Sequence, residues 1–127
     1  MTDRELINKA FEASKTAYAP YSHFRVGAAL ECSSGRVFTG CNVENAALGD
    51  TICAERVAIT KAVSEGYRSF TRIAVAADSD DYCMPCGSCR QFMSEFSQEL
   101  EILSAKRDGR YVSYKLGELL PHAFSLE

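Results

Sequence analysis

The stretch that organises the chain is CAER at residues 53–56, together with PCGSC at residues 85–89. The thiols of Cys53, Cys86 and Cys89 are placed where they could meet at one ion, and a carboxylate follows the first thiol by two residues. The rest of the chain can be interpreted as the scaffold that brings these two segments together.

Zinc in proteins usually has four ligands, thiolates are common among them, and a catalytic zinc keeps one position for water. Cys53, Cys86 and Cys89 would supply the other three ligands. The C-x-x-C spacing at the start of a predicted helix lets two thiols face one ion, and Cys53 opens another predicted helix. Helix N-termini stabilise thiolates. We therefore predict a catalytic site with one Zn²⁺ per chain.

Two side chains beside Cys53 have predicted roles at this site. Glu55 is predicted to be catalytic, taking a proton from the attacking water and delivering it to a substrate nitrogen. Taken alone, it could be an acid that merely suits the helix dipole. Three thiolates would leave the zinc site negatively charged, and Arg56 lies on the same side of the helix as Cys53. We interpret Arg56 as a donor to the thiolates that offsets this charge, the alternative being a solvated surface arginine.

The other cysteines have simpler interpretations. Cys83 forms a second C-x-x-C pair with Cys86, but it precedes the predicted helix and is interpreted as a bystander. Cys32 and Cys41 sit at predicted strand ends and are interpreted as small buried or half-buried side chains. A structural four-cysteine zinc site would usually need a second C-x-x-C pair, which Cys53 lacks.

Composition restricts the function classes. The 127 residues, 46% of them apolar, predict a single globular domain over 1–127. The net charge is -3 and no basic stripe is visible, so a nucleic-acid partner is not expected. No signal peptide or membrane-spanning run is recognised, so we expect no membrane partner. Six cysteines in such a chain fit metal binding or burial in a reducing cytoplasm.

Periodicity and turn residues predict alternating helices and strands, which imply an α/β fold with helices covering a sheet. A capping box at residues 2–5 begins the first helix. The Asp108-Gly109 turn is too tight to hold a helix, so the last two strands should be antiparallel. Helices are predicted over about 3–18, between Thr51 as N-cap and Gly66, and over about 87–97, with a helical turn at 117–120; strands are predicted at 25–32, 36–41, 70–77, 100–106 and 110–115.

Five segments together resemble the small, homotetrameric, zinc-dependent cytidine deaminases that act on free nucleosides. They are residues 19–30, 40–46, 53–56, 85–91 and 119–121. The resemblance implies a three-layer α-β-α cytidine deaminase-like fold with a five-stranded mixed sheet. It also implies a hydrolase of pyrimidine salvage that converts cytidine and 2′-deoxycytidine to uridine and 2′-deoxyuridine with release of ammonia. The expected assembly is a cytoplasmic homotetramer with shared active sites.

The same resemblance implies roles for individual residues. Phe24 would lie against the pyrimidine ring, and Asn42 and Glu44 would bind the ribose hydroxyls. The backbone of Ala54 would contact the polar edge of the base. Phe124 would reach the active site of a neighbouring subunit.

Three alternatives remain at this point. Ala47, Leu48 and Asp50 depart from the family pattern, so the substrate could be another cytosine-containing nucleoside, modified or antibiotic. A polynucleotide deaminase is disfavoured by the acidic charge and by antiparallel last strands, which in polynucleotide-editing relatives are usually parallel. The third alternative is a structural zinc or binding protein in which Glu55 is incidental.

Overall fold

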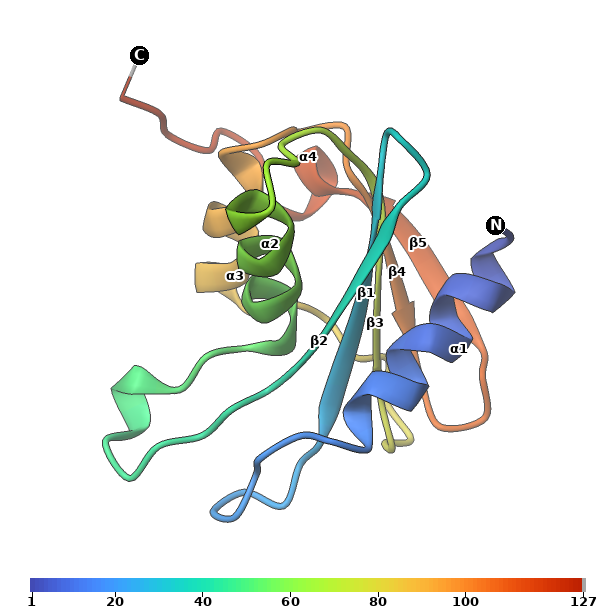
Figure 1. Ribbon diagram of the computed structural model, residues 1–127, viewed down its shortest axis with the longest axis vertical. Coiled ribbons are helices and arrows are strands. Elements are labelled where there is room, and N and C mark those ends of the chain that lie inside the picture. The colour runs from blue at the N-terminus through green and yellow to red at the C-terminus, as the bar shows by residue number, and fades with distance from the viewer. Residues whose placement is uncertain (127) are drawn as a thin grey trace.

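The computed structural model describes residues 1–126, so the last residue of the predicted 1–127 domain lies outside the described residues. The helices are α1 (Asp3–Ser14), α2 (Ala54–Ser64), α3 (Gly87–Ser94) and α4 (Leu116–Leu119), with a short 3-10 helix η1 (Leu48–Asp50). The strands are β1 (Val26–Cys32), β2 (Val37–Cys41), β3 (Phe70–Ala77), β4 (Glu101–Ala105) and β5 (Tyr111–Lys115). Helix α1 covers one face of the sheet and α2 and α3 cover the other (Figure 1), which confirms the three-layer prediction.

The strands form one five-stranded sheet in the order β2-β1-β3-β4-β5. Strands β3 and β4 are parallel and the other neighbours are antiparallel. The predicted mixed sheet with an antiparallel last pair is therefore confirmed. Gly109 has a φ of 88° in the turn between β4 and β5, a conformation that glycine adopts at no steric cost.

The sheet buries side chains on both faces, because successive residues of a strand point in opposite directions. Leu30 of β1 and Ile73 of β3 pack toward α2 and α3. Their neighbours Ala29 and Ala74 pack toward α1. The two resulting cores hold helices in fixed positions on either side of the sheet.

Two glycines allow these helices to approach the sheet closely. A Cβ atom on Gly27 of β1 would lie 1.8 Å from the carbonyl oxygen of Ala10 in α1. A Cβ atom on Gly40 of β2 would lie 2.5 Å from the carbonyl oxygen of Ala54 in α2. The lack of a side chain at Gly27 in the first strand therefore allows α1 to pack closely against the sheet.

Helix α1 begins as predicted but ends earlier. The hydroxyl of Thr2 accepts from the backbone N–H of Glu5, and the Glu5 carboxylate accepts from the backbone N–H of Thr2. The helix ends at Ser14 rather than near residue 18. The reason is a contact distant in sequence, since the backbone N–H of Tyr18 donates to the carbonyl of Asn42.

Helix α2 also begins later than predicted, with Cys53 rather than Thr51 as its N-cap. The segment before it is extended because Ile52 pairs with Val43 in an antiparallel bridge. Both backbone N–H groups of this pair donate across the bridge at 2.9 Å. Pairing between distant segments therefore sets where the helix begins, and it places the Cys53 side chain at the N-terminus.

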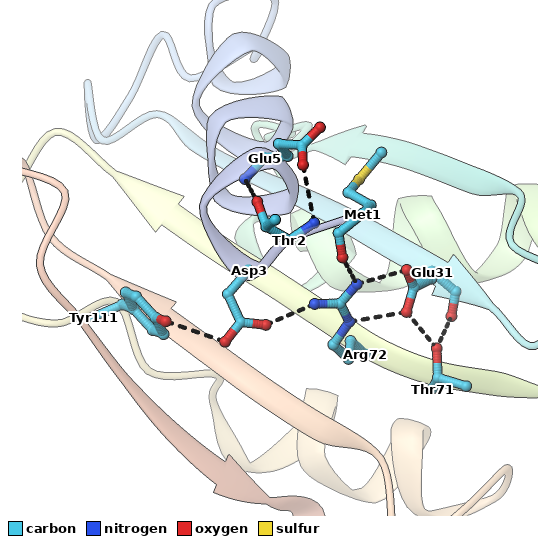
Figure 2. Close-up of polar contacts among 8 residues, drawn as sticks. All are labelled: Met1, Thr2, Asp3, Glu5, Glu31, Thr71, Arg72 and Tyr111. Atoms are coloured by element: carbon cyan, nitrogen blue, oxygen red, sulfur yellow. Dashed lines mark hydrogen bonds and ion pairs between the residues drawn. The ribbon is translucent and has the colours of Figure 1, made fainter.

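An ion network ties α1 to three strands on the α1 face of the sheet (Figure 2). Arg72 of β3 donates to Glu31 of β1 from Nε at 2.8 Å and from Nη2 at 2.6 Å. Its Nη1 donates to Asp3 of α1 at 2.6 Å, and Nη2 also donates to the carbonyl of Met1. The hydroxyl of Tyr111 in β5 donates to Asp3. All three guanidinium nitrogens thus have protein acceptors.

Candidate metal centre and active site

The three predicted metal ligands come together in the structure. The Sγ atoms of Cys53, Cys86 and Cys89 all lie within 4.8 Å of one another. Cys53 is the N-cap of α2 and Cys86 is the N-cap of α3, while Cys89 lies buried in the first turn of α3. A tetrahedral zinc with Zn–S bonds of about 2.3 Å needs sulfurs about 3.8 Å apart. The three thiols therefore lie close enough together to serve as ligands of one zinc ion.

The thiols influence each other's protonation. Hydrogen bonding with Cys89, assisted by Arg56, lowers the pKa of Cys53 to about 5. The same hydrogen bond, together with burial, raises the pKa of Cys89, which keeps its proton. A second thiolate beside the first requires a cation between them, because like charges this close repel. This is the electrostatic condition under which a metal ion binds in place of protons.

Arg56 points toward the thiols as its predicted role requires. Its Nη2 donates to Sγ of Cys53 at 3.4 Å and to the carbonyl of Thr51 at 3.5 Å. The Cys53 sulfur raises the pKa of Arg56, so the guanidinium remains charged. Its buried Nε atom has no hydrogen-bond partner within residues 1–126.

Glu55 is a buried carboxyl group in the first turn of α2, with 4% of its surface exposed. Burial is the main cause that raises its pKa, and the negative charge at Cys53 adds to the shift. A carboxyl group in this environment can hold a proton at a pH where an exposed glutamate cannot. Glu55 thus lies beside the three clustered thiols as a buried carboxyl group with a raised pKa.

These groups open into a cavity of about 260 Å³ formed by two loops and the N-termini of α2 and α3. This volume suits a small ligand, since pockets for drug-sized molecules begin at roughly 300 Å³. Every residue of the predicted binding set except Phe124 lines the cavity. The lining residues are Ser22, Phe24, Val26, Asn42, Glu44, Thr51, Cys53, Ala54, Glu55, Cys83, Met84 and Cys86.

A larger hollow of about 410 Å³ is lined by residues between Ala17 and Arg25. Its lining includes no cysteine and no carboxylate. The candidate site is therefore identified by its thiols and its buried carboxyl group rather than by its size.

Asn42 is buried and its side chain frames the segment that carries Phe24. Its Oδ1 accepts from the backbone N–H of Val26 at 2.9 Å, and its Nδ2 donates to the carbonyl of Phe24 at 2.8 Å. The amide retains a second hydrogen and a second lone pair. Asn42 can therefore hold Phe24 in place and still bind a ligand hydroxyl.

Glu44 is held by the same loop. Its Oε1 accepts from the backbone N–H groups of Tyr21 at 3.0 Å and Ser22 at 3.1 Å, and its Oε2 accepts from the Ser22 hydroxyl. These hydrogen bonds, led by that of the hydroxyl, lower the pKa of Glu44. The cavity thus presents an ionised carboxylate in a fixed orientation.

Five cavity residues were not singled out from the sequence as site residues: Ser22, Val26, Thr51, Cys83 and Met84. Cys83 lies outside the three-sulfur group, and burial raises its pKa to about 12, so it remains a thiol. Its interpretation as a bystander to the metal agrees with this. Cys83 and Met84 directly precede the metal-ligand segment, and that adjacency was the signal available in the sequence.

Other residues singled out from the sequence lie outside the cavity. Phe124 is 69% exposed, and its carbonyl accepts from Nε2 of Gln91 at 3.3 Å. Ala47, Leu48 and Asp50 lie in or beside η1 and are exposed. The departures from the family pattern are thus absent from the cavity lining of this chain.

Residues 1–103 match the family model described as the cytidine and deoxycytidylate deaminase zinc-binding region. The chain is 52% identical to a probable cytidine deaminase of Dictyostelium discoideum, covering 95% of this chain and 82% of that protein. It is 44% identical to the cytidine deaminase of Sporosarcina psychrophila, covering 100% and 94%. The crystal structure of cytidine deaminase from Burkholderia pseudomallei superposes with a TM-score of 0.95 at 46% identity, covering 98% of this chain and 100% of that one.

Proposed function

The chain belongs to the cytidine and deoxycytidylate deaminase family, and we propose that it hydrolyses cytidine and 2′-deoxycytidine to uridine and 2′-deoxyuridine with release of ammonia. The observation that carries the proposal is one arrangement. Three thiols within 4.8 Å of one another adjoin the buried carboxyl group of Glu55 at a cavity that also presents Phe24 and Glu44.

Cys53, Cys86 and Cys89 would hold the zinc ion that the family binds. When bound, zinc supplies a Lewis acid that activates the attacking water. The N-termini of α2 and α3 stabilise the thiolates, and Arg56 donates to Cys53 and offsets the excess negative charge. Three protein ligands are the number that a catalytic zinc site uses, because such a site keeps one position for water.

Glu55 is proposed to transfer protons. Its carboxylate accepts a proton from water and donates it to N3 of the pyrimidine ring, and a second proton goes to the leaving amino group at C4. One water is consumed, the C4–N4 bond breaks, and a carbonyl at C4 and ammonia are the products. Because Glu55 is shielded from bulk water, the protons are delivered to the substrate rather than exchanged with solvent.

The rest of the cavity is proposed to orient the nucleoside. The ring of Phe24 lies against the base, and the backbone of Ala54 contacts its polar edge. The free amide positions of Asn42 and the carboxylate of Glu44 bind the ribose hydroxyls. These contacts favour a free nucleoside, and the net charge of -3 offers no general attraction for a polynucleotide.

A homotetramer with shared active sites is also proposed. Phe124 and Leu126 are 69% and 98% exposed, and the hollow beside them is lined by Phe92 and Phe96. An apolar tail of this kind is better buried against a second copy, where Phe124 would reach the neighbouring cavity. Sedimentation should give the mass of four chains; a monomer would contradict the shared site.

The cellular setting is a proposal as well. The six cysteines are free thiols, which suits the reducing cytoplasm, and the reaction would serve pyrimidine salvage. None of the helices within residues 1–126 is long and apolar enough to cross a membrane.

A panel of cytosine nucleosides assayed by ultraviolet absorbance, with zinc counted on the same sample, tests the proposal. We expect cytidine and 2′-deoxycytidine to be deaminated by protein that holds one zinc per chain. Zinc-loaded protein that leaves both unchanged would overturn the assignment. A modified cytosine nucleoside preferred over both would shift the substrate and keep the reaction.

A further inference from the structure

Ser22 links two groups that are proposed to bind opposite ends of the substrate. Its hydroxyl donates to Oε2 of Glu44 and accepts from the backbone N–H of Phe24 at 3.0 Å. Its own backbone N–H donates to Oε1 of Glu44 at 3.1 Å. We propose that Ser22 is a positioning residue, which holds the ribose-binding carboxylate and the base-stacking ring in register; this inference rests on the proposed function.

The hydrogen bonds of Glu44 show what the hydroxyl does. A carboxylate has about four acceptor positions. Tyr21 and Ser22 fill three of them, two on Oε1 and one on Oε2. The position that remains is on Oε2, the oxygen that the Ser22 hydroxyl holds. The serine therefore sets the direction in which Glu44 can accept from a substrate hydroxyl.

The same hydroxyl also positions Phe24, which is proposed to contact the base. By accepting from the backbone N–H of Phe24, it fixes the start of the segment whose later part Asn42 holds through Phe24 O and Val26 N. Phe24 is 45% exposed, so burial alone does not hold it in place. Ser22 and Asn42 together then fix the distance between the ring and the carboxylate.

Loss of the hydroxyl should leave the chemical step intact. The proposed metal ligands and Glu55 lie at the N-termini of α2 and α3, and no hydrogen bond within residues 1–126 joins them to Ser22. In the Ser22→Ala variant both backbone donors to Oε1 of Glu44 remain, so the loop keeps its course. The loss should therefore raise KM and leave kcat almost unchanged.

The test compares zinc-loaded variants on cytidine, with kcat, KM, zinc content and Tm measured for each. Ser22→Ala should raise KM about tenfold, the scale of one charge-assisted hydrogen bond, with kcat within about twofold. Ser22→Thr, which keeps the hydroxyl, should restore KM. Ser34→Ala is the matched control, because Ser34 is an exposed serine that also accepts from the backbone N–H two residues later, without contacting a carboxylate. It should leave KM unchanged.

A double-mutant cycle with Glu44→Gln identifies the route of the effect. If Ser22 acts largely through the carboxylate, Ser22→Ala should raise KM by less than about threefold when residue 44 is already altered. An undiminished tenfold effect, an unchanged KM in the single variant, or a fall in kcat equal to the rise in KM would each overturn the inference.

If wild-type protein with full zinc does not deaminate cytidine, the proposed function fails and the inference fails with it. Active wild type with an unaffected Ser22→Ala variant refutes the inference alone.

Discussion

The two faces of the sheet carry two clusters of polar groups. The closed cluster consists of Arg72, Glu31 and Asp3, and the open cluster consists of Arg56, Glu55 and the three clustered thiols. On the α1 face, all three guanidinium nitrogens of Arg72 donate to protein acceptors, and Glu31 and Asp3 are its charged partners (Figure 2). On the other face, Arg56 keeps one nitrogen without a partner within residues 1–126. It faces crowded thiols beside the buried carboxyl group of Glu55. A cluster whose hydrogen-bonding groups are all paired within the protein stabilises the fold. A cluster with unpaired groups can instead bind a ligand.

The largest expected effect comes from removing the carboxylate of the open cluster. Glu55→Gln should lower kcat/KM by about a thousandfold or more, because the amide cannot carry the proton. Zinc content should be unchanged, and Tm should stay the same or rise, since a buried ionisable group is removed. Glu12→Gln, in the exposed part of α1, is the control and should keep full activity. Activity of Glu55→Gln within tenfold of wild type would refute its catalytic role.

Breaking the closed cluster should lower stability and leave activity unchanged, the reverse of the effect expected for Glu55→Gln. Arg72→Met leaves two carboxylates without their partner, at side chains that are 15% and 35% exposed. The free energy of unfolding should fall by about 3 kcal/mol in urea titrations, with kcat/KM of the folded protein preserved. Arg110→Met, which removes an exposed pair with Asp108, should cost less than about 0.5 kcal/mol. If Arg72→Met lost most of its activity and kept its stability, the closed cluster would serve function rather than the fold.

The closed cluster should also show in the pH dependence of stability. The hydrogen bonds from Arg72 and Thr71 lower the pKa of Glu31 from 4.5 to about 2. Its contribution is therefore complete above pH 4.5 and is lost as the pH falls toward 2. The stability difference between wild type and Glu31→Gln should shrink by about 2 kcal/mol over this window, after allowance for solvent screening. A difference that stays constant with pH would contradict this.

The smallest effect is expected from Arg56, which belongs to the open cluster but contacts the ion only through a ligand. Arg56→Gln should weaken zinc affinity about tenfold in competition with a chelator, because the Cys53 thiolate loses a charged donor. Lys61→Gln changes a cation in the last turn of the same helix and should leave zinc affinity unchanged. Equal zinc affinity in both variants would mean that Arg56 does not support the metal.

The sequence predicted those features whose information is local. Strand β3 lies at residues 70–77 as expected, because a continuous apolar run is typical of a strand buried on both faces. The clustering of the three cysteines was predictable because each lies at the start of a helix, where spacing determines direction. The antiparallel last pair followed from the tight turn at Gly109.

The features that escaped prediction depend on contacts between distant segments. Tyr18 and Ile52 both pair with Val43, and these bridges set the end of α1 and the start of α2. The role of Ser22 depends on Glu44, whose backbone follows the second strand. No periodicity or spacing within one segment reports such a contact. The helix boundaries and the support of the binding residues therefore required the structure.

Gly40 has a consequence for redesign of the cavity. It lies against α2, and the methyl group that it lacks would collide with the carbonyl oxygen of Ala54, a residue that lines the cavity. The position of Ala54 in the cavity wall therefore depends on the absence of a side chain at residue 40 of β2. A redesign of the cavity for a bulkier base would therefore have to include position 40, although Gly40 does not line the cavity.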